Sequence, residues 1–452
     1  MHIVIIGGGD IGYQLARDLK DKHQKIVVVD KNPATARMMG EKLDLAFVTG
    51  NGANLEVLEK ADIRSAQILI AVTESDEVNI IACMIAKTFG VPHTVARVRN
   101  PESAGSIDVD TRGLTQTQLQ IDLIISPKRT TAQEIAKRVL FPDATEVEEY
   151  AGGRAMHMAV KVAANAELVN RPLRDLELPK GCLIAGIRRE DGVFVLPGGG
   201  DRLEEGDKVY LVGKSEIMNE AGRFFHRSDT RIERVVILGG GEIGFSLANL
   251  LEADKQKSFF IKLIEKDEER VEMLNRSLGR TLVVQGDGTD LCYFNEEEIA
   301  EADVLVAATG DDRINLVASL LGRRLGVKKV ITEITRIRYA SLYRTLEVGD
   351  TVNPHLITAA KILRYTRRGD VLSLSLLQDE VAETMERILP ATSPVVGKKI
   401  SAAGFPQGLL VGTIVRGREV IIPDGDTRLR PDDHLILFST PEVSRRTDRY
   451  FS

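Results

Sequence analysis

Two glycine-rich stretches of the chain have the residue spacing of a phosphate-binding turn. Gly7, Gly9 and Gly12 form the pattern G-x-G-x-x-G directly after the apolar run 2–6, and the pattern returns at 239–244 after the run 235–238. The first glycine permits a tight turn, the second lets backbone N–H groups approach a pyrophosphate, and the third lets the next helix pack on its strand. One such pattern is a weak signal, but two copies in the required context predict two nucleotide sites.

An acidic residue ends the second apolar run of each copy. Asp30 closes VVVD and Glu265 closes FFIKLIE. A carboxylate at this position accepts hydrogen bonds from both ribose hydroxyls and repels a 2′-phosphate. The sequence therefore favours NAD(H) or another adenosine nucleotide over NADP.

Polar residues follow the later apolar runs, at the edge of the sheet where ligands of open α/β folds bind. Asn51 and Gly52 follow the third run, and Thr73 and Glu74 follow the fourth. We expect these loops to line the adenine and ribose, although Thr, Ser and Asp are also ordinary helix N-caps.

Arg97 lies in the fifth run, where it is either a charge-assisted donor to a terminal phosphate or part of a surface ion pair. The second copy has Glu333 in the same register, so the two sites should differ in their tolerance of a terminal phosphate such as that of ATP.

Asp10 and Glu242 lie inside the glycine patterns, where we expect them to cap the next helix and face away from the phosphates. The candidate nucleotide-binding residues are Gly7, Gly8, Gly9, Asp10, Ile11, Gly12, Asp30, Asn51, Gly52, Thr73, Glu74 and Arg97, and in the second copy Gly239, Gly240, Gly241, Glu242, Ile243, Gly244, Glu265, Asp287, Thr309 and Gly310.

Residues that would support catalysis or hold a metal do not stand out. The seven histidines follow no ligand or triad spacing, Ser75 and Asp76 lack a partner base, and there is no Walker A loop. The four acidic residues considered as metal ligands have no calcium-loop spacing, and the three cysteines have no C-x-x-C spacing. We therefore predict no enzyme, metal site or disulfide; the residues considered are Asp287, Asp290, Asp311, Asp312, Cys83, Cys182 and Cys292.

The elements that must position these loops follow from hydrophobic periodicity. Apolar runs at 3–6, 26–29, 46–48, 68–72, 94–98 and 123–125 alternate with helical patterns such as Ile11, Leu15, Ala16 and Leu19. This alternation predicts a parallel sheet with helices on both faces. The second copy repeats it from 235 to 352, and helices at 130–140 and 356–365 should lead into the parts that follow.

A second repeat fills the rear of each half, where the stretch from Gly181 resembles the stretch from Gly408. Asp191-Gly192 between alternating apolar runs predicts a hairpin, and the next strand is expected at 208–212. The fold class is α/β: two tandem Rossmann-like, doubly wound parallel-sheet domains, each followed by a small β-rich α+β domain. The predicted domains are 1–145, 146–228, 229–369 and 370–452.

Composition excludes several other classes of protein. With 60 Lys and Arg against 66 Asp and Glu, a net charge of −6 and no Trp, the chain lacks the character of a nucleic-acid binder. It has no apolar run long enough to span a membrane and no secretion-signal pattern at its start, so we expect a cytoplasmic chain.

The motifs GGGDIG, VVVD, TGNGA and VTESDEVN, with the second-copy motifs QGDGT and AATGDDRIN, resemble those of the RCK (regulator of K⁺ conductance) family. The resemblance covers essentially the whole chain. It implies a regulator that forms a homotetrameric ring, peripheral on the cytoplasmic face of a TrkH-like membrane potassium channel or transporter subunit. It also implies that NAD(H), or ATP and ADP, changes the shape of the ring and thereby gates potassium transport.

Two other readings stay open. An NAD-dependent oxidoreductase acting on a small substrate would turn over hydride, which absorbance at 340 nm detects. An adaptor whose Rossmann-like units are unliganded scaffolds would give no heat in calorimetry with NADH, ATP and ADP.

Overall fold

The computed structural model describes most of the chain. The described residues are 1–20, 25–99, 120–164, 166, 168–225, 232–254, 257–287, 299–336, 339–366, 373–376, 382–440, 443 and 448–451. Residues 1–136 and 232–366 form one compact unit, and residues 137–231 and 367–452 form a second. The predicted boundaries at 228 and 369, and also Cys292 and Asp290, lie outside the described residues.

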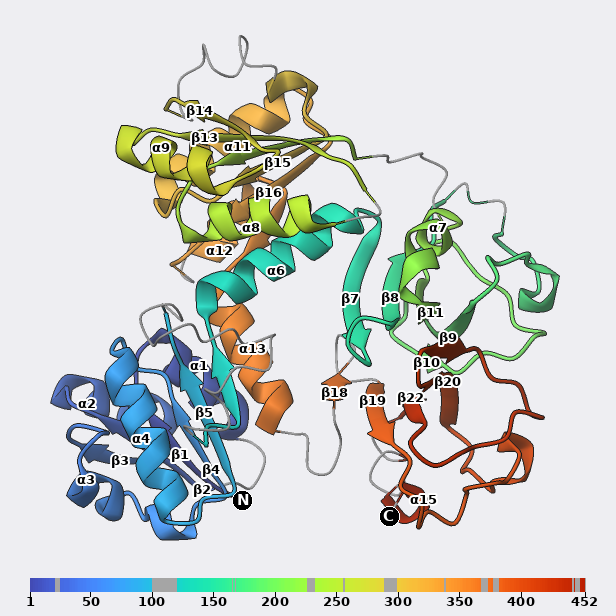
Figure 1. Ribbon diagram of the computed structural model, residues 1–452, viewed down its shortest axis with the longest axis horizontal. Helices are drawn as coiled ribbons and strands as arrows, with labels where there is room; N and C mark the ends of the chain where they lie inside the picture. Colours follow the sequence, from blue (N-terminus) through green and yellow to red (C-terminus); the bar gives the residue numbers. More distant parts are fainter. Residues whose placement is uncertain are drawn as a thin grey trace. The chain divides into compact units, whose positions relative to one another are not determined.

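The first unit contains two six-stranded parallel sheets of the same topology (Figure 1). The first has the order β3-β2-β1-β4-β5-β6 and the second the order β14-β13-β12-β15-β16-β17. Both orders are the doubly wound arrangement predicted from the apolar runs. The strands are β1 (His2–Ile6), β2 (Lys25–Asp30), β3 (Ala46–Thr49), β4 (Ile68–Ala71), β5 (His93–Arg97), β6 (Leu123–Ile125), β12 (Arg234–Leu238), β13 (Phe260–Glu265), β14 (Leu282–Gln285), β15 (Val304–Ala307), β16 (Lys329–Glu333) and β17 (Asp350–Val352).

Helices follow the strands of each sheet. They are α1 (Asp10–Lys20), α2 (Pro33–Leu43), α3 (Leu55–Lys60), α4 (Asp76–Thr88) and α6 (Pro127–Leu140) in the first copy, and α8 (Glu242–Ala253), α9 (Glu268–Ser277), α11 (Asp312–Arg324), α12 (Ala340–Thr345) and α13 (Pro354–Thr366) in the second. Successive residues of a strand point to opposite faces of the sheet. Accordingly Val4 and Ile6 of β1 pack with α3 and α4, whereas Ile3 and Ile5 pack with α1 and α2.

One covering helix of the first sheet comes from the second copy. Ala359 and Ile362 of α13 are buried in the same apolar cluster as Ile3 of β1 and Leu15 of α1. Figure 1 shows α13, drawn in orange, beside the blue α1. The sequence predicts a helix at 356–365 after the second sheet, and the structure shows that one face of this helix packs on the first sheet.

The second unit contains two five-stranded antiparallel sheets, with the orders β10-β9-β11-β8-β7 and β18-β19-β22-β20-β21. The predicted hairpin is confirmed, since β9 and β10 pair antiparallel around Gly192, whose φ is +90°. The strands are β7 (Ala144–Tyr150), β8 (Ala155–Lys161), β9 (Cys182–Arg188), β10 (Phe194–Val195), β11 (Lys208–Lys214), β18 (Ser373–Leu376), β19 (Glu383–Ile388), β20 (Leu409–Arg416), β21 (Glu419–Ile421) and β22 (His434–Ser439), and the helices are α7 (Met218–Arg223) and α15 (Asp448–Phe451). In the part of the chain that the structure describes, no helix is long and apolar enough to cross a membrane.

The two antiparallel sheets share an apolar cluster, and His157 packs against aromatic rings of this cluster. This side chain is 2% exposed, its ring centroid lies 5.9 Å from that of Phe438, and its Nδ1 lies 3.2 Å from the Tyr150 hydroxyl. No hydrogen-bond partner meets its Nε2 within the described ranges. Burial therefore lowers the pKa of His157 from its ordinary value of 6.5.

The second unit is expected to lose stability in mild acid through His157. The His157 ring of the unfolded chain takes up a proton near pH 6.5, and the buried ring of the folded chain does so only at lower pH. The neutral ring therefore contributes its full stability above about pH 6.5. Below that pH the free energy of unfolding falls, by at most about 1.4 kcal/mol per pH unit. Thermal unfolding at pH 7.5 and 5.5 measures this loss. In His157→Phe the loss should be smaller, and an unchanged loss would assign it to other groups.

Candidate functional site

The glycine turn after the first strand has the same backbone geometry in both copies. Gly7 has a φ of +103° and Gly239 a φ of +100°, a region that side chains rarely adopt. A Cβ on Gly12 would lie 1.8 Å from the Gly7 carbonyl oxygen. A Cβ on Gly9 or Gly241 would meet none of the described residues within 4 Å, so the described part of the chain leaves open space beside this glycine. Packing thus explains the first and third glycines, and the space beside the second suits a phosphate group.

The acidic residue after the second strand holds the turn. Asp30 accepts a hydrogen bond from the Gly8 backbone N–H at 2.7 Å, and Glu265 accepts one from Gly240 at the same distance. Each carboxylate uses its other oxygen for a backbone N–H two residues further on. A carboxylate has about four acceptor positions, so both retain capacity for ribose hydroxyls.

The loops after the fourth strands also repeat. The Thr73 N–H and hydroxyl both approach Asn79 Oδ1, at 2.9 and 2.7 Å, and Thr309 makes the same two contacts with Asn315. Asn79 and Asn315 are fully buried. Thr73 and Thr309 therefore fix the shape of the ligand edge, whereas the helix N-caps are Ser75 and Asp311.

The remaining loop residues lie at the same edge of each sheet. The Asn51 side chain accepts the Ala53 N–H at 3.0 Å, and a Cβ on Gly52 would lie 2.1 Å from Ile6. Asp287 is exposed after β14. The side chains of Ile11 and Ile243 are buried, so these two residues can meet a ligand only through the backbone.

Arg97 and its counterpart Glu333 give the two sites different electrostatics. Arg97 is 8% exposed and donates from Nη1 to Glu74 Oε1 at 2.9 Å, which lowers the pKa of Glu74. Glu333 is 4% exposed, and burial, with a smaller effect of Asp312, raises its pKa to about 7. Gly310 stands where the first copy has Glu74. The first site therefore holds a buried cation beside an acid, and the second holds a buried acid.

The expectation that Asp10 and Glu242 cap their helices is wrong. Both residues are the first residue of their helix, and Gly241 is the N-cap of α8. Their carboxylates pair with residues of other helices instead: Asp10 Oδ2 lies 3.3 Å from His355 Nδ1, and Glu242 Oε1 lies 3.0 Å from Lys128 Nζ. Both partners are on helices that follow the opposite sheet.

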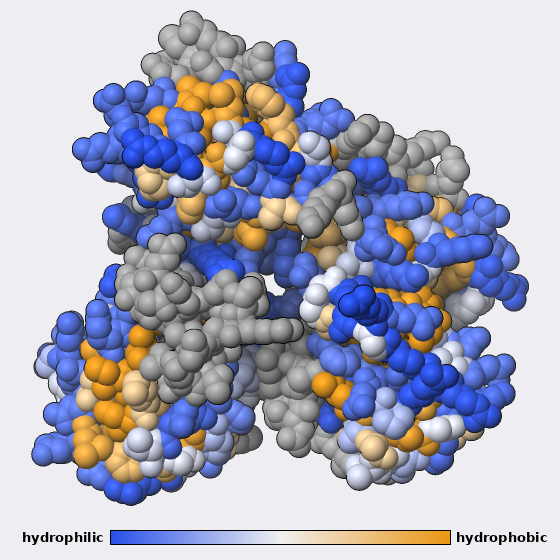
Figure 2. Space-filling model, in the orientation of Figure 1, coloured by the Kyte–Doolittle hydropathy of each residue, from blue (hydrophilic) through white to orange (hydrophobic). Residues whose placement is uncertain are grey.

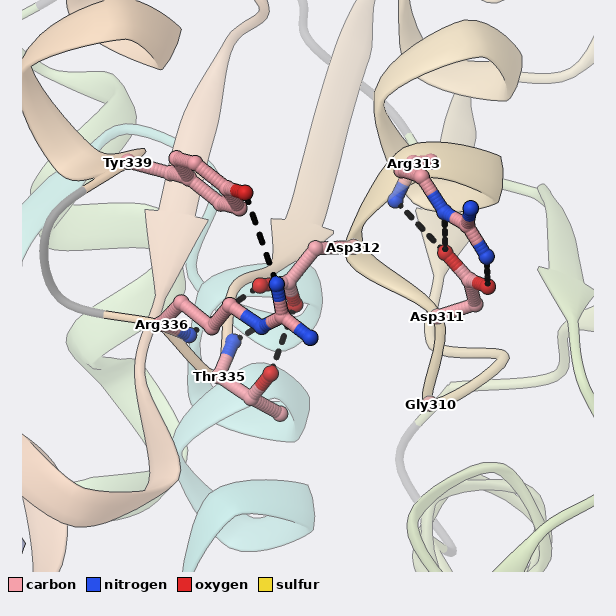
Figure 3. A pocket seen from close by; sticks show the side chains of 7 residues that line it. All are labelled: Gly310, Asp311, Asp312, Arg313, Thr335, Arg336 and Tyr339. Carbon is pink, nitrogen blue, oxygen red and sulfur yellow. Dashed lines mark hydrogen bonds and ion pairs between the residues drawn. The ribbon is translucent and has the colours of Figure 1, made fainter.

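A pocket of about 420 Å³ lies at the ends of β15 and β16 (Figure 3), and its lining residues are Gly310, Asp311, Asp312, Arg313, Thr335, Arg336 and Tyr339. Asp312 accepts hydrogen bonds from the Thr335 N–H at 2.8 Å and the Arg336 N–H at 3.1 Å. In Figure 3 Arg336 lies beside Asp312 and reaches the Tyr339 hydroxyl, whereas Arg313 folds back on Asp311.

Sequence reasoning missed Arg313 and Arg336 as candidate ligand residues of the second copy. Their position directly after the fourth and fifth strands of that sheet was the available signal. The second copy has Glu333 in the register of Arg97 and so lacks that guanidinium group. Arg313 and Arg336 place two other guanidinium groups at the same edge of the second sheet. The arrangement as a whole can hold an adenosine ribose and a diphosphate.

Comparison with known proteins assigns the chain to a family. The TrkA-N domain model matches residues 3–127 and 235–354, and the TrkA-C domain model matches residues 157–226 and 384–452. The chain belongs to the TrkA family. The resemblance drawn from its motifs is thereby confirmed, as is the fold class of tandem Rossmann-like and β-rich domains.

Members of the TrkA family match this chain over its full length. It is 34% identical over 458 residues to the Trk system potassium uptake protein TrkA homolog 1 of Methanosarcina mazei, covering 100% of both chains. It is 33% identical over 445 residues to Trk system potassium uptake protein TrkA of Vibrio alginolyticus, covering 97% of this chain and 95% of that one. The crystal structure of the GsuK RCK domain has the same fold, with a TM-score of 0.60 and 19% identity over 100% of this chain and 94% of that one.

Proposed function

We propose that the chain is a nucleotide-sensing regulatory subunit of a potassium-uptake system. The observation that carries this proposal is a pair of complete glycine turns, each held by an acidic residue, in a chain that full-length Trk potassium uptake relatives match from end to end. The GsuK channel, whose fold the chain shares with a TM-score of 0.61 at 20% identity, has been solved bound to NAD. NAD(H) and ATP or ADP are accordingly the proposed regulatory ligands.

Regulation here means that the ligand shifts an equilibrium between two shapes of the protein. A nucleotide does this only if it binds the two shapes with different affinities. The proposed output is opening or closing of a TrkH-like membrane subunit, to which the chain binds peripherally from the cytoplasm. We also retain the four-domain division at 145, 228 and 369 as part of the proposal.

The proposed assembly is a homotetrameric ring. Exposed apolar side chains occupy matching positions on two matching helices: Ile81 and Met84 on α4, and Val317 and Leu320 on α11. Figure 2 shows orange apolar surface in the regions of both helices. Soluble proteins rarely leave such patches uncovered, and a repeated patch suits contacts between copies of one chain.

Titration calorimetry with NAD⁺, NADH, ATP and ADP tests the ligand part of the proposal. Asp30→Ala is expected to weaken binding at the first site by about 1–3 kcal/mol, because it removes the acceptor for the ribose hydroxyls and for the Gly8 N–H. Glu265→Ala should do the same at the second site only, and so serves as the matched control.

Absorbance at 340 nm during the same experiments separates sensing from hydride transfer. Binding without turnover supports a regulator, whereas steady turnover with a small substrate would make the chain an oxidoreductase. Absence of heat with all four nucleotides would leave unliganded scaffolds and would contradict the proposed function.

A further inference from the structure

The acidic residue inside each glycine turn meets a basic residue from the opposite copy. α6 and α13 each begin with a proline after the last strand of their own sheet, and the next residues are Lys128 and His355. Lys128 Nζ lies 3.0 Å from Glu242 in the second turn, and His355 Nδ1 lies 3.3 Å from Asp10 in the first. The same contact is thus made twice, in opposite directions, at equivalent positions of the repeat.

Apolar packing, and not the ion pair, places α13 against the first copy. Ala359 and Ile362 are buried in the core of the first sheet, and the Tyr365 hydroxyl lies 3.5 Å from His93 Nδ1. The packing of α13 therefore positions the His355 side chain at the first glycine turn. Substitution of His355 leaves this packing in place, so variants at this position report on the site.

A second observation concerns a buried polar group within electrostatic range of each contact. No acceptor meets Arg97 Nε within the described ranges, and its Nη1 is held by Glu74, on which His355 acts electrostatically. At the second site Glu333 Oε2 is buried without a partner among the described residues, and Lys128 acts on this carboxylate. Each crossing residue therefore acts on a group that belongs to, or pairs with, a buried side chain without a complete set of partners.

We propose that His355 and Lys128 complete the nucleotide sites of the opposite copies, His355 for a diphosphate bound at Gly7–Gly12 and Lys128 for one bound at Gly239–Gly244. This inference rests on the proposed nucleotide binding. Without the basic residue, the carboxylate of Asp10 or Glu242 faces the diphosphate as a like charge. With it, the acid is neutralised and a cation stands at the phosphates, so occupancy of one copy depends on a helix that belongs to the other.

The two crossing residues differ in charge, since an ammonium group is a permanent cation and an imidazole is a cation only when protonated. The charged groups that face His355 are Asp10 on α1 and Glu74 after β4, and Glu74 pairs with Arg97 and Arg99. His355→Lys places a permanent cation beside these acids and should therefore bind a diphosphate at the first site at least as tightly as the unsubstituted chain.

Calorimetry on the full chain tests the crossed assignment. NAD⁺ is used for the first site in a Glu265→Ala background, and ADP for the second site in an Asp30→Ala background. His355→Gln is expected to weaken NAD⁺ binding at pH 6 about three- to fivefold and to leave ADP binding unchanged. Lys128→Gln should do the reverse, and Lys128→Arg should retain ADP binding.

Charge rescue gives a readout that a merely structural role would not change. In the Glu265→Ala background, the NAD⁺ binding that His355→Gln weakens should be retained in His355→Lys. Losses at the copy that contains the substituted residue, or an equal loss in His355→Gln and His355→Lys, would overturn the crossed assignment alone. Absence of NAD⁺ and ADP binding in the unsubstituted chain would overturn the proposed function as well.

Discussion

Gly12→Ala is expected to destabilise the first Rossmann-like domain by about 3 kcal/mol or more and to abolish nucleotide binding there. The new methyl group would lie 1.8 Å from the Gly7 carbonyl oxygen, so α1 or the turn must move. The gain in helix propensity from Gly to Ala is about 1 kcal/mol and does not offset this overlap. Urea unfolding and calorimetry with NAD⁺ measure the two effects.

Gly9→Ala is the matched control for Gly12→Ala. Nothing lies within 4 Å of a Cβ at Gly9, so stability should change by less than about 1 kcal/mol. Nucleotide affinity should still fall at least about tenfold, because the methyl group occupies the space that the phosphates need. The pair Gly241→Ala and Gly244→Ala repeats the comparison in the second copy. Full affinity in Gly9→Ala would show that the ligand does not bind over this turn.

The double variant Ile81→Glu with Val317→Glu is expected to dissociate the proposed tetramer. Each side chain is 44% exposed in the single chain, on α4 and α11 respectively. If these helices meet other copies, each contact acquires a buried, unpaired carboxylate, which should weaken association at least about 100-fold. Sedimentation of the full chain, with and without NAD⁺, measures the mass of the assembly.

Val193→Glu is the control for this assembly experiment. Val193 is also an exposed apolar residue, 53% exposed, but it lies in a hairpin turn of the second unit. Its substitution should leave the mass unchanged. A tetramer that survives the double variant would place the interface elsewhere on the chain.

Local patterns predict a large part of this structure. Runs of three to five apolar residues locate the strands of both parallel sheets, because a strand buried on both faces has no polar alternation. Because the two copies share one register, a contact in one copy predicts the equivalent contact in the other. The contact of Thr73 with Asn79 is repeated by Thr309 and Asn315. The predicted position of the candidate nucleotide site follows from these two facts together.

Contacts between distant segments are what the sequence could not predict. The pattern of Ala359 and Ile362 indicates a buried helix face but not which sheet buries it. For the same reason Asp10 and Glu242 read as helix caps, since their partners His355 and Lys128 lie in the other half of the chain. The sequence leaves two roles for Arg97, a ligand of a terminal phosphate and a member of an ion pair. The structure shows an ion pair of Arg97 with Glu74.

The crossing of α13 onto the first sheet has a consequence for biosynthesis. The strands of that sheet are all translated by residue 125, but the helix that completes the cluster around Ile3 and Leu15 ends at Thr366. Domains generally fold in order as they leave the ribosome. Here part of the apolar surface of the earliest domain stays uncovered until most of the chain has been made.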